Sequence, residues 1–359
     1  MLNIVYDNLP HLNVWFAPKI YNRDFSTQHN KPLPWFLHLA DNLTFHSSAE
    51  GLDSFIYPII MHEPYIQVRS LISNNNDFGF WSFVSDSVIK GLREKRGWII
   101  IDMVSEPIVK YDFECILRSL TDSSEVPNDR ILINTVSPDF VDNDRVFCYP
   151  SHLEMGCYIN NIQETHKPCP CKPITKKDVS YPHKRFLLLN NHIDYDAGNI
   201  LAKYASANHA SFLDSSGTIP GYTDLHLPQA IHATDLNVVV EAYVDNDVIE
   251  YPYMTEKIYR NIRYKKPFIV MGQQYTLASL HKLGYKTFNP LIDEYYDNMY
   301  YTSDRVKAVI KELTKLISLT DGDFKYFLSE CEPILEHNYN NLMSRINQTN
   351  DWLEGLKNL

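Results

Sequence analysis

The feature that most constrains the fold of this chain is a series of short, uninterrupted apolar runs separated by segments with helical periodicity. The run at 98–101 predicts a buried strand over 97–104, and a second buried strand is predicted at 131–136. Between them, apolar residues recur at helical spacing over 112–120. Strands that are apolar on both faces and joined by helices are typical of a parallel sheet covered on both sides. The sequence therefore predicts an α/β fold.

The same alternation returns in the second half of the chain, after a stretch at 150–182 that contains several prolines and no apolar periodicity. We interpret this stretch as a connection between two α/β halves. The predicted domains are 1–150, a linker at 151–182, a second domain at 183–325 and a C-terminal helix at 326–359. In the second half we predict strands at 185–191, 237–244 and 267–271, and helices at 197–206, 255–263, 275–283, 303–319 and 323–346. Residues 336–339 are expected to dock the last helix back onto the domains.

Composition excludes several classes of protein. The chain has 359 residues and a formal net charge of -11, which argues against charge-driven coating of DNA. Its apolar runs are strand-sized and far short of the ~18–20 residues that span a bilayer. Six cysteines are too few for a disulfide scaffold, and the first residues lack the pattern of a secretory signal. We expect a cytoplasmic protein with mostly reduced thiols.

The most informative segment is 241–297. Thr255 is a good N-cap for the helix that follows, and a helix N-terminus attracts anions. Lys257 lies in its first turn, and Arg260 is one of five basic residues within 257–266, a density that fits a bound diphosphate. Glu241 ends a predicted strand, where its carboxylate can accept hydrogen bonds from ribose or sugar hydroxyls. The alternative is that the basic residues form a solvated helix face.

This segment resembles the donor half of the α1,3-fucosyltransferases. It is more similar still to a broader set of glycosyltransferase-like proteins that is common in phages and bacteria. The pieces that match are a strand ending in Glu, Thr-Glu-Lys at a helix start, and three later motifs. The later motifs are Pro-Phe-Ile-Val at 267–270, Leu-Gly-Tyr-Lys-Thr-Phe at 283–288 and Asp-Glu-Tyr-Tyr-Asp at 293–297. The match covers about 60 residues well and about 170 loosely.

The resemblance implies a GT-B-like pair of Rossmann-like domains that face each other across a cleft. The first would be the acceptor side and the second would bind a nucleotide-sugar. By motif, Lys257 would contact the donor diphosphate, and Glu256 and Glu241 the nucleoside or the sugar. Asn190 ends a strand that related proteins follow with a basic residue, usually Arg, and here no Arg follows within ten residues. The resemblance implies no metal and no cofactor besides the nucleotide-sugar co-substrate.

An inverting transfer requires a base to accept the proton of the acceptor hydroxyl. Glu106 lies just beyond the predicted strand at 97–104, directly before Pro107, and is our first candidate for the base. Asp102 is the second. The alternative for Glu106 is that it caps the following helix or faces solvent. A retaining reaction would need no such base.

The connection at 151–182 and its flanks raise two further possibilities. Cys148, Cys157, Cys169 and Cys171 lie within 24 residues, but only one pair is closely spaced, and its single intervening residue is tighter than a usual zinc knuckle. Unpaired thiols are the alternative to a metal site. A run of lysine and arginine at 167–185 could follow a nucleic-acid backbone or the donor phosphate. A solvated linker is the alternative there.

The hypothesis from sequence is a glycosyltransferase that moves a sugar from a nucleotide-sugar to a hydroxyl acceptor. The acceptor would be a glycan or, in a phage setting, a hydroxymethylated DNA base in the host cytoplasm. The net negative charge of the chain argues against DNA as the acceptor, and the basic run at 167–185 argues for it. The alternative is a non-catalytic protein that keeps the fold and binds a nucleotide or a sugar. The absence of an Arg after Asn190 favours that alternative.

Overall fold

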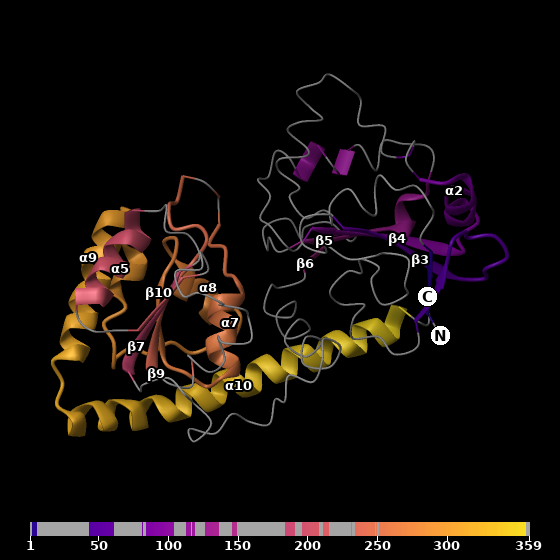
Figure 1. Ribbon diagram of the computed structural model, residues 1–359. Coiled ribbons are helices and arrows are strands. Elements are labelled where there is room, and N and C mark those ends of the chain that lie inside the picture. Colours follow the sequence, from indigo (N-terminus) through magenta and orange to yellow (C-terminus); the bar gives the residue numbers. More distant parts are fainter. Residues whose placement is uncertain are drawn as a thin grey trace. The chain divides into compact units, whose positions relative to one another are not determined.

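The computed structural model describes a defined part of the 359-residue chain. The described residues are 2–5, 43–60, 81, 84–103, 113–115, 117–118, 126–135, 146–148, 184–190, 196–207, 211–214, 231, 234–247, 249 and 251–356. Contacts between residues divide the chain into two units. The first comprises 1–157 and 347–359, and the second comprises 158–346. Each unit contains one sheet (Figure 1).

The first unit contains a six-stranded, all-parallel sheet in the order β2-β1-β3-β4-β5-β6. Its strands are β1 (Leu2–Val5), β2 (Leu43–His46), β3 (Phe55–Ile60), β4 (Gly97–Met103), β5 (Ile131–Thr135) and β6 (Val146–Cys148). The predicted strands at 97–104 and 131–136 are confirmed as β4 and β5. Helix α2 (Asp86–Arg93) packs on β4, and the short 3-10 helix η4 (Asn128–Arg130) leads into β5.

Close packing against one aromatic ring explains two glycines of this unit. A Cβ on Gly91, in α2, would lie 2.5 Å from the Phe55 ring, and a Cβ on Gly97 would lie 2.2 Å from it. Only glycine lets α2 and the start of β4 approach Phe55 this closely. Gly97 is the first residue of β4, and α2 has already ended at Arg93.

The second unit contains a four-stranded, all-parallel sheet in the order β10-β9-β7-β8. Its strands are β7 (Lys184–Asn190), β8 (Ser211–Asp214), β9 (Thr234–Val240) and β10 (Phe268–Met271). Helices α5 (Asp196–Ala207) and α9 (Thr302–Ile317) cover one face, and α7 (Glu256–Arg263) and α8 (Thr276–Lys282) cover the other (Figure 1). The predicted α/β class with parallel sheets is confirmed. The arrangement of two domains across a cleft stays a prediction.

The strand predicted at 237–244 was placed too late: β9 begins at Thr234 and ends at Val240. Its partner β10 ends at Met271, so Glu241 is the last residue with a ladder bond, from its N–H to the Met271 carbonyl. Beyond it, the Val244 carbonyl accepts a hydrogen bond from the buried guanidinium of Arg305. The strand thus ends where its partner β10 ends, although apolar residues continue to Val244.

The last helix, α10 (Asp321–Leu356), docks onto the second unit as its sequence predicts. Asn338 accepts a hydrogen bond from the Lys286 N–H at 2.7 Å and donates one to the Lys286 carbonyl at 2.8 Å. His337 bonds the Gly284 carbonyl at 2.9 Å, and the Tyr339 ring lies under the side chains of Arg263 and Lys265. Within the described part of the chain, no helix is long and apolar enough to cross a bilayer.

Candidate functional site

The candidate site lies at the carboxyl edge of the second sheet, where β9 ends and α7 begins. In open parallel sheets this edge is where ligands bind. Thr255 is the N-cap of α7, as predicted, with extended backbone and a side-chain oxygen that accepts the Lys257 N–H. Its own N–H donates to Glu241 Oε1 at 3.2 Å, and its hydroxyl donates to Glu241 Oε2. The N-cap thus joins the end of β9 to the start of α7.

Lys257 completes this arrangement. Its ammonium donates to Thr255 Oγ1 at 3.0 Å and lies 3.9 Å from Glu241 Oε2. The side chains of Lys257 and Glu241 are both buried. Glu241, Thr255 and Lys257 therefore contact one another directly, while their predicted roles in donor binding stay predictions. These contacts also use the charges of Lys257 and Glu241 inside the fold, which the sequence did not reveal.

A glutamine that the sequence analysis missed holds the loop between β9 and α7. Gln273 is buried, accepts the Tyr253 N–H at 3.0 Å, and donates to the Ile249 carbonyl at 3.0 Å. Its signal was available, because Gln273 follows the apolar strand 268–271 at the same carboxyl edge as Glu241. The Gln273 amide fixes the loop that delivers Thr255 to its capping position.

The other predicted site residues are described only in part. Glu256 is the first residue of α7 and Asn190 the last residue of β7, but their side chains lie outside the described part. Arg260 is half-buried on α7. Asp102 lies in β4, with only its backbone described, and Glu106 lies outside the described residues altogether. The roles of all these residues stay predictions.

The basic residues of 257–266 do not form one anion site, which corrects the expectation from their density. Arg263 donates to the Tyr339 hydroxyl at 3.3 Å, and Lys265 pairs with Glu336. Lys266 donates to the Thr234 carbonyl at 2.6 Å. These three side chains lie at the C-terminal end of α7, where α10 and the start of β9 supply their partners. Only Lys257 is at the helix N-terminus.

The three motifs behind the family resemblance interlock as a structural unit beside β10. The Phe268 and Phe288 rings pack edge to face with centroids 5.2 Å apart. Glu294 accepts the Phe288 N–H at 2.7 Å and the Thr287 hydroxyl at 2.5 Å. Asp297 accepts the N–H groups of the first turn of α8. These motif residues therefore stabilise the fold around the candidate site without forming part of it.

Burial dominates the electrostatics of that unit. Desolvation raises the pKa of Glu294 above its ordinary value, although the bonds from Thr287 and Phe288 oppose the shift. Desolvation likewise raises the pKa of Asp297, against the two N–H groups that it accepts. Each carboxylate is thus held in a polar pocket that favours its charge less than water does.

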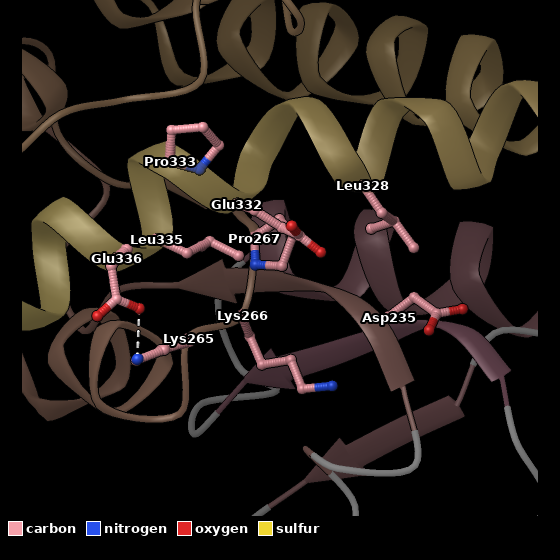
Figure 2. Close-up of a pocket in the computed structure, with 9 residues that line it drawn as sticks. All are labelled: Asp235, Lys265, Lys266, Pro267, Leu328, Glu332, Pro333, Leu335 and Glu336. Atoms are coloured by element: carbon pink, nitrogen blue, oxygen red, sulfur yellow. Dashed lines mark hydrogen bonds and ion pairs between the residues drawn. The ribbon is translucent and has the colours of Figure 1, made fainter.

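The described part of the second unit contains two sizeable cavities, and none of Glu241, Thr255 and Lys257 lines either of them. One cavity, of about 620 Å³, lies at the opposite end of the strands, where Asp235 and the Lys266–Pro267 segment face α10 (Figure 2). In Figure 2 the Lys265–Glu336 ion pair lies at its side. The other, of about 570 Å³, lies between residues 293–299 and α9.

The spacing of the cysteines near the connection at 151–182 suggested a possible zinc site. Cys157, Cys169 and Cys171 lie outside the described residues, and only the backbone of Cys148 is described. Among the residues whose side chains are placed, no group of three or more His, Cys, Asp or Glu residues could hold a metal ion. The sequence expectation of unpaired thiols in the connection, with a zinc site as its alternative, stays a prediction.

Comparisons with known proteins give one similarity. No protein-family model and no curated protein matches the chain. Among solved structures, it resembles the crystal structure of an α1,3-fucosyltransferase with a TM-score of 0.39 and 12% sequence identity, over 95% of this chain and 92% of that chain. At that TM-score and identity, the similarity carries no conclusion about the chemistry of the site.

Proposed function

We propose that the chain is a nucleotide-sugar-dependent glycosyltransferase whose second unit binds the donor. One observation carries the proposal: Lys257 lies in the first turn of α7, at the carboxyl edge of a parallel sheet, in contact with Thr255 and Glu241. A helix N-terminus carries about half a positive charge and N–H groups without intrahelical partners. A lysine added there creates a site suited to a diphosphate.

On binding, the nucleotide-sugar would take over hydrogen bonds that Lys257, Thr255 and Glu241 now make with one another. A phosphate oxygen that accepts a bond from Lys257 would share the ammonium with Glu241. Glu241 would then be able to accept hydrogen bonds from ribose or sugar hydroxyls. In this proposal Arg260 and Glu256, both on α7, assist the donor contacts. Glu106, or Asp102 in its place, accepts the proton of the acceptor hydroxyl. The acceptor is a glycan or a hydroxymethylated DNA base.

The first experiment is a thermal-shift screen against UDP, GDP, ADP, CMP and dTDP and their common sugar conjugates. A ligand at 100 times its Kd stabilises the protein by about 2.7 kcal/mol, which is a visible shift. Each hit is then titrated by calorimetry against Lys257→Met and against Lys282→Met, a matched change of an exposed lysine at the end of α8. We expect a loss of affinity of tenfold or more in Lys257→Met only. Equal affinities in both variants would remove Lys257 from the donor site.

A second candidate function is a non-catalytic protein that keeps the same fold and binds a nucleotide or a sugar. The observation that favours it is the buried Lys257–Glu241 pair, in which each charge already has a partner. Release of nucleotide from a bound nucleotide-sugar, with and without acceptor, separates the two functions. Turnover that falls by a factor on the order of 10²–10⁴ in Glu106→Gln, with donor binding intact, would support the enzyme. Binding without any turnover would support the second candidate.

A further inference from the structure

A cavity of about 570 Å³ lies between the 3-10 helix η7 (Tyr295–Asn298) and the first turns of α9. Its volume is within the range of ~300–1,000 Å³ typical of small-molecule sites. The residues that line it do not include Glu241, Thr255 or Lys257. An inference about this cavity is therefore independent of the proposed donor site.

One wall of the cavity carries an exposed aromatic ring. Tyr295 is 67% exposed, and within the described part of the chain its hydroxyl has no hydrogen-bond partner. Its neighbour Tyr296 is buried, so the segment is anchored in the core. A tyrosine that presents its ring to solvent beside a cavity offers an apolar face together with a polar edge.

The rim of the cavity carries charges of both signs. Lys307 pairs with Asp304 at 3.0 Å on the exposed side of α9, and Lys311 is exposed one turn further along. Asp293 accepts the Tyr295 N–H at 3.1 Å, and its own N–H donates to the buried Glu312 at 3.2 Å. The Tyr295 ring is thus surrounded by side chains that can both donate and accept hydrogen bonds.

Buried groups hold this wall in place before any ligand arrives. The guanidinium of Arg305 is buried and donates to the carbonyls of Met299 and Tyr300 at 2.6 Å each. Asn246 donates to the Tyr300 carbonyl at 2.8 Å, and Gln274 donates to the Asn298 carbonyl at 2.7 Å. A wall that is already fixed loses little conformational freedom on binding.

We propose that this cavity is a binding site for a neutral oligosaccharide. The Tyr295 ring would stack against the C–H face of a pyranose, while Asp293, Asp304 and Lys311 would bond its hydroxyls. Three lining carboxylates, of Asp293, Asp304 and Glu312, against two lysines disfavour a phosphate or a nucleotide.

The exposed apolar groups nearby favour a carbohydrate over a protein partner. Between residues 275 and 301 the exposed large hydrophobic side chains are all tyrosines. They are Tyr275, Tyr295, Tyr300 and Tyr301. The core of a protein interface is depleted in charge, whereas charged side chains surround Tyr295 here. Tyrosines interspersed with carboxylates provide both the stacking faces and the hydrogen-bond acceptors that sugars require.

The test is binding of the full-length protein to an array of defined neutral oligosaccharides built from glucose, galactose, mannose, fucose and N-acetylglucosamine. The Kd of each hit is then measured by calorimetry. We expect Tyr295→Ala to weaken oligosaccharide binding at least tenfold, and Lys311→Ala at least fivefold. The matched control is Tyr326→Ala on α10, because Tyr326 is 66% exposed and does not line the cavity. Its Kd should equal that of the unmodified protein.

The outcomes that overturn the proposal are distinct from a failure of donor binding. Absence of binding at millimolar oligosaccharide, or equal loss in Tyr295→Ala and Tyr326→Ala, would refute the carbohydrate site. So would nucleotide binding that depends on Tyr295 without any glycan binding. Because Tyr295 is exposed, its truncation should leave the thermal unfolding midpoint unchanged, which excludes misfolding as the cause of a loss. A Lys257→Met variant should keep full glycan affinity.

Discussion

Glu241 and Lys257 form an ion pair whose side chains are 0% and 4% exposed, with 3.9 Å between Oε2 and Nζ. Thr255 links the two, since it donates to the carboxylate and accepts from the ammonium. The pair lies where a strand ends and a helix begins. The same residues are therefore candidates for donor binding and contributors to stability, and the two roles need separate measurements.

The first prediction concerns this pair. Replacing one member of a buried ion pair leaves the other charge buried alone, which typically costs about 3–5 kcal/mol. We expect Lys257→Met to lower the free energy of unfolding by that amount in urea titrations. Glu241→Gln keeps an oxygen for the Thr255 bonds and should cost less. The double variant should cost less than the sum of the two single changes, because neither charge is then left alone.

The control is Lys307→Met, which removes an exposed ion pair with Asp304. Exposed pairs contribute about 0–1 kcal/mol, so this variant should unfold close to the unmodified protein. If Lys257→Met were as mild as Lys307→Met, the buried pair would not stabilise the fold.

The second prediction concerns Asn338 on α10. Its side chain is buried and makes two hydrogen bonds with the peptide groups of Lys286. Asn338→Ala removes both hydrogen bonds to the part-buried peptide groups of Lys286, at about 0.5–1.5 kcal/mol for each. We expect a loss of about 1–3 kcal/mol in chemical unfolding.

The neighbouring Glu336→Ala is the comparison for Asn338→Ala. Glu336 is exposed and pairs with Lys265 on the same docking face. We expect it to change stability by less than about 1 kcal/mol. Equal losses in the two variants would mean that α10 docks through its charges rather than through the Asn338 bonds.

The third prediction is a dependence of stability on pH. Burial raises the pKa of Glu294 above its ordinary value of 4.5, so the folded state binds this proton more tightly than the unfolded chain does. The contribution of Glu294 to stability is therefore fully present below pH about 4.5 and is lost as pH rises through the raised pKa. Asp297, whose pKa is also raised, acts in the same direction.

Glu294→Gln has no proton to lose and should flatten this slope. The measurement is the free energy of unfolding in urea at several pH values from 4 to 7, for both proteins. As pH rises from 4 to 7, the free energy of unfolding of Glu294→Gln should increase steadily relative to that of the unmodified protein. A constant difference would show that ionisation of Glu294 is not coupled to folding.

Much of the second unit was predictable because its signals are local. The runs at 186–189 and 267–271 are apolar without interruption, and Thr255 followed by a helical pattern marks the start of α7. The class of fold, the order of these elements and the docking role of 336–339 follow from such patterns. The end of β9 was misplaced because apolar residues continue to Val244, whereas pairing with β10 stops at Val240.

The strands β1, β2 and β3 were missed because their local signals are weak or interrupted. β1 and β2 have four residues each, and all three strands lie among turn signals in a segment rich in aromatics and proline. The apolar run of β3 contains Pro58, a residue that argues against a strand interior. At the site, the sequence identified Glu241, Thr255 and Lys257 but not Gln273. The position of Gln273 just after the strand at 268–271 was a usable signal, and its bonds to the Tyr253 N–H and the Ile249 carbonyl give that position its role.

The last prediction concerns Tyr275, the N-cap of α8. Its φ is 68°, in the left-handed region that costs a residue with a Cβ roughly 1–2 kcal/mol. Tyr275 is 50% exposed, and within the described residues its hydroxyl has no hydrogen-bond partner. A backbone hydrogen bond keeps Tyr275 in this conformation, since its N–H donates to the Asp297 carbonyl at 2.8 Å.

Comparing Tyr275→Gly with Tyr275→Ala isolates this strain, because both remove the ring and only glycine adopts positive φ freely. We expect the glycine variant to be the more stable by about 1 kcal/mol in urea unfolding, despite the greater entropy of glycine in the unfolded chain. An alanine variant of equal or greater stability would show that the backbone relaxes at no cost.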